Sequence, residues 1–148
     1  MPEVKYTHIV RCPIDVIWEF IKDMNNWATF FPGYQKHEML SDTDSIWWLL
    51  GNLGILTRVI QFQIHITEWI DYKKAALTLK GLNESVEGEG AFILASYMDG
   101  ASSSEVTLKL KLKAGGVMGP VVNALMKPML RPVAEDIARK ISAQLEKE

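Results

Sequence analysis

Apolar and polar positions divide the chain into a strand-rich middle and helical ends. From Gly115 to Glu148 apolar residues recur every three or four positions. They are Met118, Val121, Val122, Leu125, Met129, Val133, Ile137, Ile141 and Leu145. This spacing predicts one amphipathic helix, and the stretch after Pro120 would be roughly 40 Å long at 1.5 Å per residue. Pro128 and Pro132 leave two interpretations: a bent helix, or a helix that starts only after Pro132.

The N-terminal third predicts a strand followed by two short helices. Val4 to Val10 is rich in β-formers, and Ile14 to Ile21 then has helical apolar spacing after Pro13. Asn25 or Asn26 can cap a second short helix that contains Trp27 and is stopped by Pro32-Gly33.

Six further strands are predicted before the C-terminal helix. They are Tyr34 to Ser41, Ser45 to Leu50, Leu56 to Ile70, Ala75 to Lys80, Glu87 to Asp99 and Val106 to Lys113. Gly88 and Gly90 indicate a bulge or a sharp coil in the fifth of these. Strict alternation and short turns favour an antiparallel meander, so we predict a single α+β domain over residues 1–148, with the long helix packed on a curved sheet.

Composition and charge exclude several classes of function. Apolar residues make up 48% of the chain, and the formal net charge of -2 gives no electrostatic footprint for nucleic acid. The lone Cys12 excludes an intramolecular disulfide and a multi-cysteine zinc site, and His8, His37 and His65 lack metal-ligand spacing. No phosphate or dinucleotide loop is present, so no cofactor is expected. Without an N-terminal apolar leader or a membrane-length apolar run, we expect a cytoplasmic protein.

Three polar residues share a strand face with apolar neighbours. His8 has the parity of Val4, Tyr6 and Val10, while Arg58 and Glu68 have the parity of the apolar face of Leu56 to Ile70. An unpaired polar group on such a face costs about 1–3 kcal/mol, so His8 requires a partner, a water or a ligand. Arg58 and Glu68 have a simpler explanation, which is that they lie at the ends of the sheet where parity no longer decides burial.

Several segments together resemble a known superfamily. Cys12 to Asp23, followed by Phe31-Pro32-Gly33, is similar to the helix-grip superfamily of START, birch-pollen-allergen (Bet v1-like) and polyketide-cyclase-like domains, also called SRPBCC. Gly88-Glu89-Gly90, and Leu112 to Gly116 before the long helix, resemble the branch of this superfamily that contains the G subunit of carbon monoxide dehydrogenase. The resemblance implies a helix-grip fold, in which a seven-stranded curved antiparallel sheet wraps around the C-terminal helix and encloses a hydrophobic cavity.

The same resemblance implies a class of function. Superfamily members bind lipids, sterols, quinones or polyketides, and some are enzymes. The carbon monoxide dehydrogenase branch implies a small quinone- or lipid-binding, membrane-associated accessory to a redox enzyme. Longer members of the branch continue beyond the helix, so we expect no stable membrane anchor within these 148 residues.

Candidate ligand contacts follow from combining the resemblance with the apolar pattern. Methionine and aromatic residues on the helix and the facing strands fit either a packed core or an apolar cavity, and the resemblance favours the cavity. The candidates are His8, Trp48, Arg58, Phe62, Leu110, Met118, Val122, Leu125, Met126 and Met129.

The leading hypothesis is a non-enzymatic carrier or accessory protein for a hydrophobic small molecule. One alternative is a polyketide cyclase or dehydratase that uses His8, Arg58 or Glu68. The other is an accessory protein that acts through its surface, on a redox enzyme or a membrane. Exposure of Trp27 or Trp69 beside the turn at Gly115 to Pro120 would favour this last hypothesis, since Gly115 to Ala134 contains no acidic residue.

Overall fold

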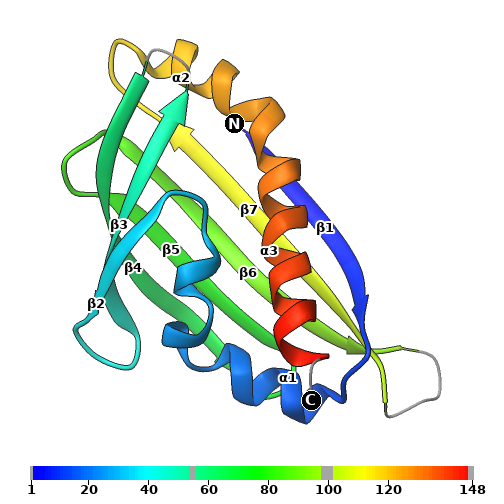
Figure 1. Ribbon diagram of the computed structural model, residues 1–148. Coiled ribbons are helices and arrows are strands. Elements are labelled where there is room, and N and C mark those ends of the chain that lie inside the picture. Colours follow the sequence, from blue (N-terminus) through cyan, green and yellow to red (C-terminus); the bar gives the residue numbers. More distant parts are fainter. Residues whose placement is uncertain (1, 54–55, 98–101, 147–148) are drawn as a thin grey trace.

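The computed structural model describes residues 2–53, 56–97 and 102–146. Figure 1 shows one curved sheet with the C-terminal helices lying across its concave side. The elements are β1 (Glu3–Val10), α1 (Ile14–Ile21), the 3-10 helices η1 (Met24–Asn26) and η2 (Ala28–Phe30), β2 (Tyr34–Met39), β3 (Asp44–Leu53), β4 (Leu56–Ile70), β5 (Lys74–Gly81), β6 (Val86–Ser96), β7 (Ser104–Ala114), α2 (Gly119–Met126), the 3-10 helix η3 (Lys127–Met129) and α3 (Leu130–Leu145).

The sheet has seven strands in the order β1-β7-β6-β5-β4-β3-β2, and every neighbouring pair is antiparallel. Strands β2 to β7 form the predicted meander, and β1 joins its edge beside β7. The α+β helix-grip prediction is therefore confirmed.

The segment after α1 differs from the second short helix that the sequence predicts. Two 3-10 helices take its place, and the cap is Asp23, whose carboxylate accepts a hydrogen bond from the Asn25 N–H at 3.0 Å. The predicted cap at Asn25 or Asn26 is wrong. Trp27 is fully buried, and its indole N–H donates to the Ile21 carbonyl at 2.8 Å.

The C-terminal helix is bent, as one of the two interpretations predicts. Pro128 lies inside η3, which separates α2 from α3. Pro132 lies in the first turn of α3, where a missing N–H removes no helical hydrogen bond. The alternative of a helix that begins only after Pro132 is wrong. Figure 1 shows α2 at one end of the sheet and α3 running along its concave face.

An irregularity in β4 changes which side chains face the helices. The register with β5 shifts between Ile66 and Glu68, after which Trp69 lies opposite the buried Ala75. Glu68 is therefore directed away from the core and pairs with Lys74 at 3.1 Å. Of the two interpretations of Glu68, an inward-facing residue or one at the end of the sheet, the inward-facing one is wrong, because a bulge shifts the alternation by one residue.

The predicted bulge at Gly88 and Gly90 is absent, since β6 pairs in regular register with β5 and β7 at both positions. Close backbone approach explains Gly88 instead. A Cβ added there would lie 2.3 Å from the Lys111 carbonyl oxygen.

The core is filled by aromatic side chains at the α1 end of the concave face. The Trp27 ring lies 5.0 Å from the Phe92 ring and 5.7 Å from the Trp47 ring, and Phe31 contacts Trp47 at 4.9 Å. The packed-core interpretation therefore holds for this end of the molecule.

Candidate functional site

The inner face of β7 becomes progressively more exposed toward α2. Val106 is 0% exposed, Leu108 2% and Leu110 6%, and Leu112 is half-buried. All four side chains have the same inward parity. The inner face of β7 is thus most deeply buried near α1 and less so at Leu112, while Ala114 at its end is covered again and is 5% exposed.

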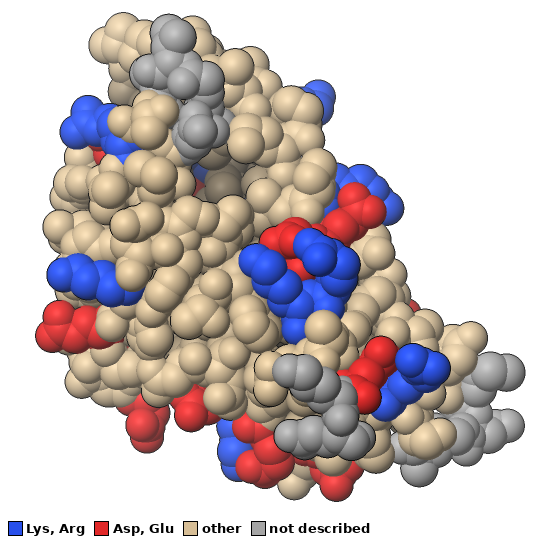
Figure 2. Space-filling view, viewed as in Figure 1, with Lys and Arg blue, Asp and Glu red and all other residues tan. Residues whose placement is uncertain are grey.

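Other strands show the same gradient. On β4, Ile64 is fully buried, Phe62 is 7% exposed and Ile60 is half-buried. Leu49 on β3 and Val86 on β6 are also half-buried apolar residues at the α2 end. We call this end of the inner face the α2 mouth, defined by Leu49, Ile60, Val86 and Leu112. Figure 2 shows the surface hollowed beside α2.

One face of α2 is turned toward the sheet. Met126 is buried and Val122 is half-buried. The carboxamide of Asn123 accepts a hydrogen bond from the Ala114 N–H at 2.8 Å and donates to the Ala114 carbonyl at 3.1 Å. These two bonds fix α2 to the end of β7, above the α2 mouth.

The opposite side of the segment from Met118 through α2 to the end of η3 is exposed, and it contains three of the predicted ligand contacts. Met118, Leu125 and Met129 are between 40% and 50% exposed. Their predicted orientation toward the sheet is wrong, because the bend at η3 frees α2 from the orientation of α3.

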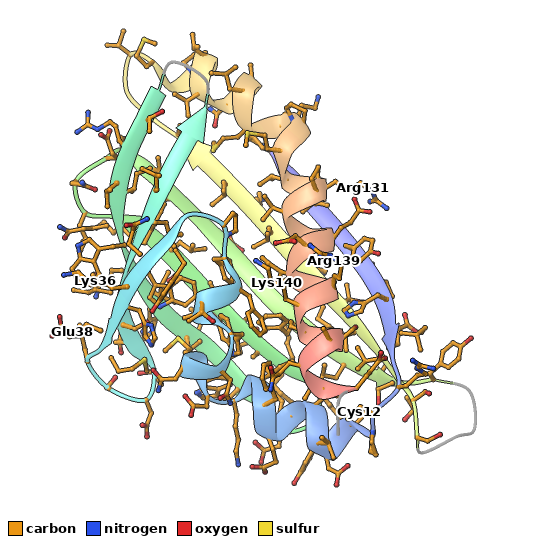
Figure 3. All side chains as sticks on the ribbon, viewed as in Figure 1. Cys12, Lys36, Glu38, Arg131, Arg139 and Lys140 are labelled. Atoms are coloured by element: carbon orange, nitrogen blue, oxygen red, sulfur yellow. The ribbon has the colours of Figure 1, made fainter. Side chains whose placement is uncertain are left out.

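Trp48 does not face the helices either. Its neighbour Trp47 is fully buried in the core, so Trp48 lies on the outer face of β3, where the Lys36 ammonium sits 4.5 Å from its ring centre. Figure 3 shows Lys36 extending from β2 away from α3. Trp48 is therefore no lining residue of the space between helix and sheet.

His8 faces α3, as its parity predicts, and both its ring nitrogens are buried without a hydrogen-bonding partner among the described residues. Its ring stacks on Tyr6 at 6.0 Å, and the Arg131 guanidinium lies 5.4 Å from the Tyr6 ring. Burial lowers the pKa of His8 from its ordinary value, while the Val106 backbone and the Glu146 carboxylate oppose this with smaller effects. The imidazole is therefore neutral near pH 7.

Arg58 lies at the α2 end of β4, opposite Gly51 of β3, and has the same strand parity as Ile60 and Phe62. Its side chain is 65% exposed, and its Nε lies 2.6 Å from a carboxylate oxygen of Glu84. This ion pair places one positive and one negative group near the start of β4.

The predicted residues therefore fall into separate groups. Phe62, Leu110, Val122, Met126 and Arg58 belong to the α2 end. His8 lies opposite Val106, eight residues of β7 away from Ala114, which is roughly 26 Å along a strand. His8 and the α2 residues do not form one constellation.

Two features of the site were not found from the sequence. The alternation of apolar residues places Ile60 and Leu112 on the inner face of the sheet. It does not show which end of that face is more accessible. The sequence did not mark Asn123 as important, because its hydrogen bonds to Ala114 depend on where α2 meets the end of β7.

Other chemistry is not supported by the described part of the chain. Within residues 2–53, 56–97 and 102–146, no group of three or more histidine, cysteine or acidic side chains could hold a metal ion. Cys12 is buried in the core. No helix among these residues is long and apolar enough to cross a membrane.

Solved structures share this fold over nearly their whole length. A conserved protein from Geobacillus kaustophilus has a TM-score of 0.78 and 15% identity, covering 98% of this chain and 95% of its own. A START superfamily protein from Mycobacterium smegmatis has a TM-score of 0.72 and 16% identity, covering 98% and 97%. The Zhui aromatase/cyclase from Streptomyces sp. R1128 has a TM-score of 0.65 and 17% identity, covering 98% and 93%. These similarities establish a START-like, cyclase-like fold.

Sequence comparison gives the family. No curated protein matches the chain. Residues 7–146 match the CoxG family, which is described as the G subunit of carbon monoxide dehydrogenase, in agreement with the predicted branch of the superfamily. The chain therefore belongs to the carbon monoxide dehydrogenase CoxG family.

Proposed function

We propose that the protein binds a hydrophobic small molecule, such as a lipid, a quinone or a polyketide-like compound, between its C-terminal helices and the sheet. It would act as a carrier or as an accessory protein. The observation that supports this most strongly is the change in exposure along β7 from Val106 to Leu112 and along β4 from Ile64 to Ile60, which leaves apolar side chains of both strands partly accessible toward α2. Accessible apolar surface inside a concavity is the usual form of a small-molecule site.

Apolar contacts at the α2 mouth would supply most of the affinity. Phe62 and Leu110 from the sheet and Val122 and Met126 from α2 are the proposed contacts. Burial of apolar area contributes about 25 cal/mol per Å², less the cost of ordering the ligand. Methionine adapts to irregular apolar shapes, which suits Met126 to this position.

Two polar groups would orient the ligand. Arg58 at the α2 end can donate hydrogen bonds to a carbonyl or an acidic headgroup. His8 lies deeper, and its neutral imidazole can both donate and accept a hydrogen bond. A ligand at the α2 mouth would meet Arg58 first, and contact with His8 would require the packed side chains toward the α1 end to move apart.

Direct binding of an apolar probe tests the proposal. Decylubiquinone and a fluorescent fatty acid would be titrated against the protein, and native mass spectrometry would identify any ligand that co-purifies. Leu112→Arg places a charge at the α2 mouth and should weaken probe binding roughly 10-fold or more. Lys113→Gln, at the next position on the exposed face, is the matched control. Equal affinity in both variants, or no binding of either probe, would remove the proposal.

The cyclase alternative retains less support. Glu68 is directed away from the core, and Arg58 is engaged by Glu84, which leaves His8 as the one candidate acid or base among the three residues considered. General acid–base catalysis by an isolated imidazole would require a substrate carbonyl within hydrogen-bonding distance of it. Turnover of a polyketide substrate that is abolished in His8→Phe would favour this alternative over a carrier.

Membrane contact through α2 is a second candidate, which a specific observation favours. Val117 is 97% exposed, and Met118, Val121, Leu125 and Met129 are between 40% and 50% exposed. Figure 2 shows uncharged atoms covering most of the α2 end of this face. Lys127 and Arg131 are its charged residues, and each basic residue contributes about 1 kcal/mol near an anionic leaflet. The same surface could dock on a redox enzyme.

Sedimentation with lipid vesicles tests the membrane contact. The paired change Val117→Ser and Met118→Ser should reduce binding to anionic vesicles roughly 5- to 10-fold by removing apolar area. Leu82→Ser, a change at another exposed apolar residue, is the control. Binding that is absent, or that both variants retain equally, would exclude a membrane role for this face. Trp27 gives this hypothesis no support because it is fully buried.

A further inference from the structure

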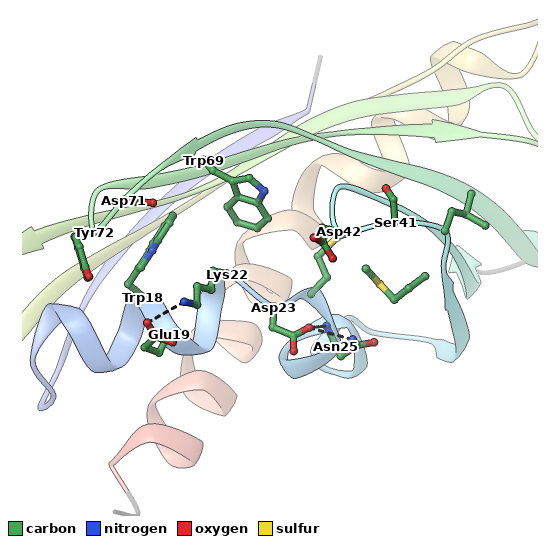
Figure 4. Close-up of a pocket in the computed structure, with 13 residues that line it drawn as sticks. Trp18, Glu19, Lys22, Asp23, Asn25, Ser41, Asp42, Trp69, Asp71 and Tyr72 are labelled. Carbon is green, nitrogen blue, oxygen red and sulfur yellow. Dashed lines mark hydrogen bonds and ion pairs between the residues drawn. The ribbon is translucent and has the colours of Figure 1, made fainter.

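A second concavity lies at the other end of the molecule, beside α1. It has a volume of about 770 Å³ and lies between α1, the turn that joins β2 to β3, and the turn that joins β4 to β5. Figure 4 shows the side chains that line it. We call it the α1 pocket, and none of the proposed contacts at the α2 mouth lines it.

Three aromatic side chains form one wall of the α1 pocket. The Trp18 ring meets the Trp69 ring edge-to-face at 5.9 Å, and the Tyr72 ring lies 6.3 Å from Trp18 on its other side. Trp18 is almost fully buried, whereas Trp69 is half-buried and Tyr72 is 49% exposed. Figure 4 shows the Trp69 side chain extending from β4 toward α1. Aromatic surface is therefore accessible from inside the pocket.

Two backbone features place these rings. The β4 bulge turns Trp69 toward α1 in place of Glu68. Tyr72 adopts a left-handed conformation with φ of 63°, which is uncommon for a tyrosine because its Cβ crowds the backbone there. The aromatic wall therefore depends on two departures from regular strand and turn geometry.

The remaining charge of the pocket is negative. Glu19, Asp23, Asp42 and Asp71 line it together with a single cation, Lys22, which Glu19 already binds at 2.9 Å. Neither Asp42 nor Asp71 forms a hydrogen bond or an ion pair with another described residue. The negative field acts on Lys22, whose pKa is raised first by the hydrogen bond that it donates to Glu19 and further by the charges of Glu19 and Asp71.

We propose that the α1 pocket binds an organic cation, a protonated amine or a quaternary ammonium group, with its charge against the accessible aromatic surface of Trp69 and in the negative field of the Asp42 and Asp71 carboxylates. Aromatic faces attract such cations through their negative quadrupole, and tryptophan is the strongest of them. A quaternary ammonium group is weakly hydrated and suits an aromatic wall. Anions and nucleic acid would be repelled by the carboxylates.

Choline and its neutral carbon isostere, 3,3-dimethylbutan-1-ol, separate charge recognition from apolar burial. Each would be titrated into the labelled protein while NMR follows the indole N–H signals. Choline should shift the Trp69 and Trp18 signals saturably, and the isostere should bind roughly 3- to 30-fold more weakly. Equal responses to the two compounds, or no saturable shift with choline, would overturn the proposal.

Substitutions in the wall and in the carboxylates complete the test. Trp69→Leu should weaken choline binding roughly 3- to 30-fold, and Trp69→Phe should retain part of it because a ring remains. Trp48→Leu, on the outer face of the sheet, should have no effect. Asp42→Asn and Asp71→Asn should each weaken binding roughly 2- to 5-fold at low salt, an effect that Glu135→Gln should not reproduce. Equal choline affinity in Trp69→Leu and the wild type would reject the site.

These measurements are independent of the apolar-ligand proposal. Leu112→Arg at the α2 mouth should leave choline binding unchanged, and Trp69→Leu should leave decylubiquinone binding unchanged. Loss of both ligands in one variant would mean that there is a single continuous site, contrary to the proposal of a separate α1 pocket.

Discussion

The carboxamide of Asn123 pairs with both backbone groups of Ala114, accepting from its N–H at 2.8 Å and donating to its carbonyl at 3.1 Å. This is the pairing that a neighbouring strand would make with the end of β7, but a helix side chain makes it. The contact joins α2 to the sheet at the α2 mouth, so it controls how firmly the proposed ligand site is covered.

Removing the Asn123–Ala114 hydrogen bonds should increase local unfolding of α2 more than it lowers the stability of the core. Asn123→Ala removes two part-buried hydrogen bonds and should lower the free energy of unfolding by about 1–3 kcal/mol. Hydrogen exchange should accelerate in α2 before it does so in α3. Urea unfolding and exchange mass spectrometry would measure both, and Gln144→Ala at an exposed site of α3 should stay within about 0.5 kcal/mol. Unchanged exchange in α2 would show that Asn123 does not hold the helix.

The two glycines of β6 should respond differently to the same substitution. A Cβ at Gly88 would lie 2.3 Å from the Lys111 carbonyl, which is backbone and cannot move aside. Gly88→Ala should therefore destabilise the protein by about 3 kcal/mol. At Gly90 the nearest atom is a methyl of Leu77 at 3.3 Å, so Gly90→Ala should stay within about 1 kcal/mol of the wild type. Thermal unfolding of both variants compares them, and equal losses would contradict the close-approach argument for Gly88.

The sequence predicted the strands well because alternation with a period of two is a local property. The bounds predicted for β4, Leu56 to Ile70, are those observed. The orientation at its C-terminal end was not predictable in the same way. A bulge adds one residue to a strand, and no particular residue type marks its position in the sequence. Here the bulge places Trp69 on the inner face in place of Glu68.

The candidate site was predicted less well because it depends on tertiary geometry. Helical spacing correctly identified Ile137 and Ile141 as buried residues of α3. The same stripe extended to Met118 and Leu125, but the bend at η3 lets α2 turn those residues to solvent. The spacing of apolar residues identifies one face of a straight helix. It does not predict which way that face points in the part of the chain before a bend.

The Asp44 carboxylate provides a test of local electrostatics at the β2–β3 turn. Thr43 donates its hydroxyl to Asp44 at 2.8 Å and the His65 ring lies 2.8 Å from the other oxygen, and these contacts lower the pKa of Asp44, with the Thr43 hydrogen bond as the largest cause. Thr43→Val should raise this pKa toward the ordinary value.

Carbon NMR of the aspartate carboxyl groups between roughly pH 2 and 6 would measure the change. Because the folded pKa lies below the unfolded one, the contribution of Asp44 to stability is present above the unfolded pKa and is lost as pH falls through the folded pKa. An unchanged Asp44 titration in Thr43→Val would contradict the assignment.

The buried imidazole of His8 should make the fold sensitive to acid. Burial lowers the pKa of His8 in the folded state, so below about pH 6.5, the ordinary histidine value, the unfolded chain binds a proton that the folded chain resists. Stability linked to His8 is therefore complete above the unfolded pKa and declines as pH falls toward the folded pKa. His8→Phe keeps an aromatic ring beside Tyr6 and removes this decline.

Urea unfolding at several pH values between roughly 5 and 8 compares the two proteins, which differ only at position 8. The difference between wild type and variant should grow in favour of His8→Phe as pH falls. A bound ligand that accepts a hydrogen bond from His8 would raise its pKa and shift the decline to a different pH, so the same experiment with decylubiquinone present reports contact at His8. A difference that does not change with pH would mean that the imidazole is solvated and that its nitrogens are available to water rather than to a ligand.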